Sequence, residues 1–136
     1  MEKVVVKVEW CNKNFCAVVG DNVPGAIVVA SDTMDHLKKD VVESIEFHVE
    51  GMVADGDEVP AWLASGDYAL EWSLGVSALI RACEPLVSIA AISRATGINQ
   101  RLLSHYANGI KTPRSAQREK IVNGIRSIGR QLISVV

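Results

Sequence analysis

The spacing of apolar residues changes near residue 76 from mostly strand-like, with one helical stretch at residues 37–48, to helical throughout, and this change limits the folds available to the chain. Before it, apolar residues recur at every second position, as in residues 3–10 and 68–74, which is typical of half-buried strands. After it, they recur every three or four positions, as amphipathic helices require. The sequence therefore predicts an α+β protein, with a strand-containing domain at residues 1–76 and an all-α domain at residues 77–136.

The first domain is predicted to be a small sheet with one helix on one face. The expected order is strand, strand, strand, helix, strand (β-β-β-α-β), with strands at residues 3–10, 15–19, 26–30 and 68–74. Because Asn12 and Asn14 both tolerate turn backbones, the first two strands are expected to pair antiparallel.

The helix of this domain is expected to begin after Asp32 or Thr33, either of which can cap its first turn. Four residues mark its inner side: Leu37, Val41, Ile45 and His48. Gly51 is a plausible helix end, and residues 52–67 then form a polar loop.

The second domain is predicted to hold four helices. The first begins near Ser77 and ends before Pro85, two others lie at residues 89–96 and 100–108, and the last begins after Ser115 and runs to about residue 135. The predicted caps of these last three helices are Ser88, Asn99 and Ser115.

Two of these helices, at residues 89–96 and 100–108, flank Gly97 and fit a helix-turn-helix. The apolar contacts between them are expected from Ile92, Ile98, Leu103 and Tyr106. In such a motif the start of the second helix enters the major groove of DNA, so Gln100 and Arg101 are the best candidates for reading bases. The complete set of predicted DNA-contacting residues is Asn99, Gln100, Arg101, Ser104, His105, Lys111 and Arg114. Lys111 and Arg114, in the loop after the second helix, would contact the phosphate backbone.

The charge of the chain is divided between the two domains. Residues 1–76 contain five Lys and no Arg against 14 Asp and Glu, a net charge of −9. Residues 77–136 contain nine Lys and Arg against two Glu, a net charge of +7. A basic domain suits a polyanion such as DNA, and an acidic domain suits a basic protein partner.

Two stretches of the sequence resemble the HicB family of antitoxins, in the form with a C-terminal lambda-repressor-like (XRE-type) helix-turn-helix. The first is Pro24-Gly25 followed by Ser31-Asp32-Thr33 and an acidic amphipathic helix. The second runs from Thr96-Gly97-Ile98-Asn99-Gln100 through Ser104-His105-Tyr106-Ala107-Asn108-Gly109 to Lys111 and Pro113. Members of the family often carry Gly-Asp-Thr where this chain has Ser31-Asp32-Thr33.

This resemblance implies a type II toxin–antitoxin component with a degraded RNase H-like N-terminal domain. That domain would bind and neutralise a HicA-type toxin, a small basic mRNA interferase. The C-terminal domain would bind the operator of its own operon and repress it. The resemblance thus implies two partners, the toxin and double-stranded DNA, and no enzymatic activity.

Two other functions fit the same residues. One is a stand-alone transcription regulator whose N-terminal domain senses a ligand or a protein. The other is a residual nuclease that uses Asp32, Asp55 or Asp57 with magnesium, although no metal-binding or catalytic motif is recognisable. We therefore expect no catalytic residue, no cofactor and no metal site.

The remaining features bear on location and assembly. The three cysteines are an odd number, which fits reduced thiols, and no apolar run is long enough to cross a membrane. The charged start does not fit a secretory signal, so we expect a cytoplasmic protein. Ile133, Val135 and Val136 extend beyond the predicted core and favour a homodimer or higher homo-oligomer.

Overall fold

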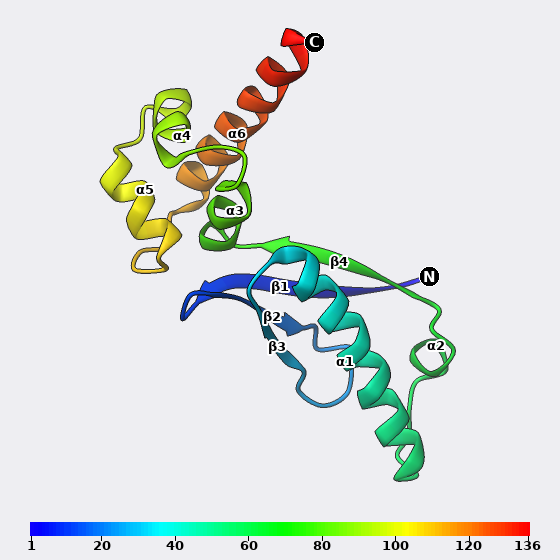
Figure 1. Cartoon of the computed structure of the whole chain (residues 1–136). Coiled ribbons are helices and arrows are strands. Elements are labelled where there is room, and N and C mark those ends of the chain that lie inside the picture. The colour runs from blue at the N-terminus through cyan, green and yellow to red at the C-terminus, as the bar shows by residue number, and fades with distance from the viewer. The chain divides into compact units, whose positions relative to one another are not determined.

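The computed structural model describes all 136 residues, and they form an α+β protein with one four-stranded mixed sheet and six helices (Figure 1). The chain divides into two compact units, Met1–Gly75 and Val76–Val136, which we call the acidic unit and the basic unit. None of the helices combines the length and the apolar character that spanning a membrane requires.

The sheet belongs to the acidic unit. Its strands are β1 (Glu2–Cys11), β2 (Asn14–Val19), β3 (Val28–Ser31) and β4 (Tyr68–Leu74), in the spatial order β3-β2-β1-β4. The β1–β2 and β2–β3 pairs are antiparallel, as expected for the first pair, whereas β4 is parallel to β1. A parallel return needs a long crossover, and the helices between β3 and β4 provide it.

One face of the sheet is buried by helix α1 (Met34–Ala54). Val4, Val6 and Val8 of β1 are fully buried, and so are Leu37, Val41 and Ile45 of the helix. These are the positions expected from the spacing of apolar residues, and each such side chain contributes about 1.5–3 kcal/mol when it leaves water.

The β1–β2 turn has two residues in the left-handed region, Asn12 at φ 49° and Lys13 at φ 63°. Two such residues match the right-handed twist of a tight hairpin. Asn12 therefore lies in the turn, as predicted. Asn14 is instead the first residue of β2, and Lys13 is the second turn residue with a positive φ.

The prediction for residues 52–67 is wrong in two places. Helix α1 passes through Gly51 and ends at Ala54, and a short helix, α2 (Ala61–Ala64), lies within the expected loop. A glycine inside a helix costs only about 1 kcal/mol, which the packing of a 21-residue helix outweighs. The residue that follows the helix cap, Gly56 at φ 75°, supplies the left-handed backbone instead.

The third strand, predicted at residues 26–30, begins two residues later and spans Val28–Ser31. Ile27 still accepts a hydrogen bond from the backbone of Val19 (3.1 Å). The preceding loop is fixed by His48, which donates from Nε2 to the carbonyl oxygen of Pro24 (2.6 Å). Ser31 is buried and donates to Asp40 Oδ2 (2.5 Å), so it ties the strand to α1.

The basic unit is all-α. Its helices are α3 (Val76–Cys83), α4 (Ile89–Thr96), α5 (Gln100–Ala107) and α6 (Ser115–Val135). The predicted caps are confirmed for α4, where Ser88 Oγ accepts from the backbone of Ala91 (3.1 Å), and for α5 at Asn99. The cap predicted for α6 is wrong: Ser115 is its first residue, and Arg114 precedes it without a side-chain cap. Asn108 is the C-cap of α5 rather than its last residue.

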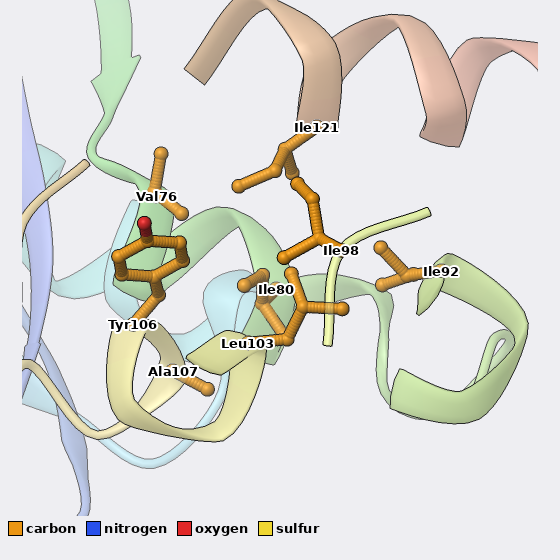
Figure 2. Packing of buried hydrophobic residues seen from close by; sticks show 8 residues of the cluster. All are labelled: Val76, Ile80, Ile92, Ile98, Leu103, Tyr106, Ala107 and Ile121. Atoms are coloured by element: carbon orange, nitrogen blue, oxygen red, sulfur yellow. The ribbon is translucent and has the colours of Figure 1, made fainter. Parts of the chain in front are cut away.

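The core of the basic unit joins all four helices (Figure 2). Its buried members are Val76, Ile80, Ile92, Ile98, Leu103, Tyr106, Ala107 and Ile121. They include the four residues predicted to form the apolar contacts between the helices at 89–96 and 100–108. The last turns of α6 extend past this core, and Leu132 there is 58% exposed.

Candidate nucleic-acid interface

The turn between α4 and α5 is held by side chains as well as by the backbone. Gly97, at φ 74°, donates its N–H to the carbonyl oxygen of Ser93 (2.8 Å). The Ser93 hydroxyl donates to the carbonyl oxygen of Ile98 (2.5 Å). Thr96 Oγ1 donates to the carbonyl oxygen of Ile92 (2.7 Å) and accepts from the N–H of Ile98 (3.2 Å). The direction in which α5 leaves α4 is therefore fixed.

Helix α6 supports this turn from the other side. Gly124 is buried and faces Thr96 so closely that a Cβ at this position would overlap the threonine methyl group. Glycine is thus required where the two helices cross, a role that the sequence analysis did not assign to it.

The start of α5 carries the two residues predicted to read bases. Asn99 Oδ1 accepts from the backbone N–H of Arg101 (2.7 Å), so the Asn99 side chain caps the helix. Gln100 and Arg101 are exposed, while Leu103 and Tyr106 lie in the core on the opposite side of the same helix. The outer surface of α5 is therefore polar at its first turn.

The other two predicted residues of α5, Ser104 and His105, are only half-buried rather than fully exposed. Ser104 and His105 lie one helical turn, four residues, after Gln100 and Arg101. These four residues therefore belong to one side of α5. Leu102 is also half-buried and packs against the core, which leaves it less available for contact with a thymine methyl group.

Arg81 of α3 holds the far end of α5. Its Nε donates to the carbonyl oxygen of Ala107 (3.1 Å), and its guanidinium also donates to Asn108 Oδ1 and to Glu84 Oε1 (3.0 Å). These bonds satisfy carbonyl and amide groups where the helix stops. This role of Arg81 was not predicted from the sequence. The available signal was that this arginine is the single charged residue of helix α3.

The loop between α5 and α6 brings cationic groups to the surface. Lys111 and Arg114 are exposed, and they line a shallow cleft together with Tyr106, Thr112, Pro113 and Gln117. The first turn of α6 has no side-chain cap and no acidic residue. Its free N–H groups and the positive end of the helix dipole therefore add to the charge of the two side chains.

The acidic residues considered for a metal site are not gathered into one. Asp32 is hydrogen-bonded to His36 at the start of α1, and Asp55 caps its end. With a rise of about 1.5 Å per residue, the two ends of this helix lie about 30 Å apart, so these two carboxylates cannot share an ion. No group of three or more His, Cys, Asp or Glu side chains is placed to hold a metal ion.

The cysteines are free thiols. Burial raises the pKa of Cys83, and burial together with the neighbouring Cys11 raises the pKa of Cys16. Since the thiolate is the reactive form, neither residue is an activated nucleophile.

Comparison with known proteins gives no relative for this chain: no protein-family model, no curated protein and no solved structure matches it.

Proposed function

We propose that the basic unit binds double-stranded DNA, with α4 and α5 as a helix-turn-helix and α5 as the recognition helix. The observation that carries the proposal is the exposure of Gln100 and Arg101 at the start of a helix whose opposite side is locked into the core. In helix-turn-helix proteins this is the part of the second helix that reaches base edges. The net charge of +7 on this unit supports the same partner.

Base recognition and backbone contact would come from different residues. Arg101 has the paired donors that match the O6 and N7 atoms of guanine, and Gln100 has the donor and acceptor that match adenine. Lys111, Arg114 and the uncapped start of α6 would contact phosphates. The phosphate contacts fix the register and supply the salt-dependent part of the affinity.

The acidic unit is proposed to bind a basic protein, so that the chain acts as an antitoxin and as a repressor of its own operon. Two observations support this role: the net charge of −9, and the resemblance of both halves of the sequence to HicB antitoxins. In this proposal the partner is a HicA-type mRNA interferase, and the acidic unit itself performs no catalysis.

The exposed end of α6 supports a symmetric dimer. Ile133 and Val135 are 77% and 85% exposed on turns that extend past the core, which is an unfavourable place for large apolar side chains in a monomer. Two recognition helices in a dimer would read half-sites about 34–36 Å apart. Sedimentation of the full chain at micromolar concentration is expected to give a dimer, and a monomer would contradict this part of the proposal.

Selection of duplexes from a random library by the full-length protein tests the DNA-binding function. We expect one recurrent, two-fold related sequence, bound about 10³-fold or more tightly than a scrambled duplex at the same salt concentration. Weak binding with no preferred sequence would overturn the proposal, because a basic surface alone binds all DNA alike.

A further inference from the structure

The acidic unit has a groove of about 810 Å³ between strand β3 and helix α1. In Figure 1, β3 lies at the border of the sheet next to the helix. The strand side of the groove is formed by residues 26–29, and the helix side by residues of the middle and end of α1.

Both walls of the groove expose apolar groups. Val28 of β3 is 68% exposed, and Phe47 of α1 is 79% exposed. Phe47 therefore lies outside the core, whereas Leu37, Val41 and Ile45 on the inner side of the same helix are fully buried. Exposed apolar groups gathered in a groove are typical of a surface that another chain covers.

Strand β3 adds an unpaired backbone to this surface. It is an edge strand that pairs with β2 on one side only. The backbone groups on its other side are available to a further strand, and an exposed edge of this kind is where an extended peptide can join a sheet.

The charges around the groove determine which peptide fits. Four carboxylates line it, those of Asp40, Glu43, Asp55 and Asp57, and no Lys or Arg does. Its single imidazole, His48, is already bonded to the carbonyl oxygen of Pro24. Charge complementarity therefore favours a cationic occupant and disfavours an acidic one.

We propose that this groove binds an extended, cationic segment of the partner protein, which adds to β3 as a fifth strand. Side chains that alternate along the segment would place apolar groups against Val28 and Phe47 and basic groups against the carboxylates. This inference rests on the proposed function of the acidic unit, and it names the surface that meets the basic partner.

The test uses the full-length chain and a synthetic peptide of about eight residues that alternates Val with Lys or Arg, a length within the usual range of strands. Binding is measured by calorimetry, and its location by the amide resonances of the chain. We expect the largest shifts at Val28–Ser31 and at the end of α1. A peptide with a central proline keeps its charge but loses a backbone donor, so it should bind about tenfold more weakly.

Two charge-reversed variants distinguish peptide binding in the groove from general electrostatic attraction to the acidic unit. Glu43→Lys with Asp57→Lys should weaken peptide binding about tenfold or more, the effect expected for losing two close charge pairs. Glu46→Lys with Glu50→Lys changes the net charge by the same amount on the side of α1 that faces β4, and it should have a much smaller effect. Equal losses in both variants, or no shift at β3, would overturn the inference.

Binding of the selected duplex serves as the independent readout. Glu43→Lys with Asp57→Lys is expected to leave sequence-specific DNA binding intact. If the wild-type chain binds its duplex but not the peptide, the groove assignment is wrong and the DNA-binding function stands. If the groove variant loses a self-association that wild type shows, while wild type does not bind the peptide, the occupant is a second copy and the inference also fails.

Discussion

Gly124 and Gly129 both lie in α6, but only the first faces a neighbouring helix. A Cβ at position 124 would overlap the buried methyl group of Thr96, whereas a Cβ at position 129 would meet nothing within 4 Å. Thr96 cannot move away easily, because its hydroxyl holds the α4–α5 turn through two hydrogen bonds. The two glycines should therefore respond to substitution with opposite signs.

Gly124→Ala is expected to lower the free energy of unfolding of the basic unit by about 1–3 kcal/mol, the usual cost of forcing extra volume into a packed contact. Gly129→Ala should raise it by about 0.5–1 kcal/mol, because alanine loses less backbone entropy in a helix. Urea unfolding of residues 76–136, followed by helical circular dichroism, measures both. A stabilised Gly124→Ala variant would contradict the described crossing of α4 and α6.

Arg101 and Lys111 are both exposed cations, but they are proposed to contact different parts of DNA. Arg101→Ala should weaken binding to the selected duplex by about 1–3 kcal/mol and relax the preference at one base pair. Lys111→Ala should weaken binding to all duplexes alike and reduce the salt slope by about one phosphate contact. Fluorescence anisotropy at several salt concentrations distinguishes them, and identical effects of the two variants would refute the assignment.

The exposed ion pair between His36 and Asp32 makes the stability of the acidic unit depend on pH. Their hydrogen bond (2.7 Å) and mutual charge raise the pKa of His36 above 6.5 and lower the pKa of Asp32 below 3.8. The contribution of His36 to stability is complete below its ordinary pKa and disappears as pH rises through the raised value. The contribution of Asp32 is present above its ordinary pKa and disappears as pH falls through the lowered value. The pair therefore stabilises the fold most at pH values above the ordinary pKa of Asp32 and below the ordinary pKa of His36.

Asp32→Asn should return the pKa of His36 towards 6.5, since the hydrogen bond from Asp32 is the largest cause of its shift. Titration of the imidazole resonances by NMR measures this change. Asp35→Asn is the matched control, because Asp35 contributes only a smaller, through-space charge effect. An unchanged His36 pKa in Asp32→Asn would show that the pair does not form in solution.

Among the helices, α4 has both of its ends where the sequence predicts them, and α5 has its start there. Ser88 and Asn99 are strong caps, and Gly97 gives a clear stop, so local chemistry alone defines these ends. The end of α1 could not be predicted in this way, because tertiary packing carries the helix past Gly51. Helix α2 is one turn long, too short to leave a periodic signal.

The turn between α4 and α5 sets the direction of the proposed recognition helix, and substitutions at Gly97 test it. The Cβ of an alanine at position 97 would meet nothing within 4 Å, so Gly97→Ala costs only the left-handed backbone, about 1–2 kcal/mol. Gly97→Asn should cost less, since asparagine tolerates this conformation. Thermal unfolding of residues 76–136 should show the larger drop in Tm for alanine. Equal effects of the two substitutions would mean that the turn is not left-handed in solution.

Over the whole chain, the division of charge could be predicted from sequence. Which residues lie together on one surface could not. The groove on the acidic unit joins residues 26–29 with Asp55 and Asp57, which are far apart in sequence and meet only because α1 lies beside β3. Likewise, the contact between Arg81 and the end of α5 spans 26 residues. The period of apolar residues predicts elements, but it carries no information on which surfaces adjoin.

We propose that one chain carries two binding units of opposite charge, and that the basic unit contacts DNA at the start of α5. The most direct measurement is an NMR titration of the full-length protein with its selected duplex, following every backbone amide. We expect the largest shifts at residues 97–101 and 111–117, and none in the sheet of the acidic unit. Largest shifts in the acidic unit, or shifts in the basic unit that avoid α5, would contradict it.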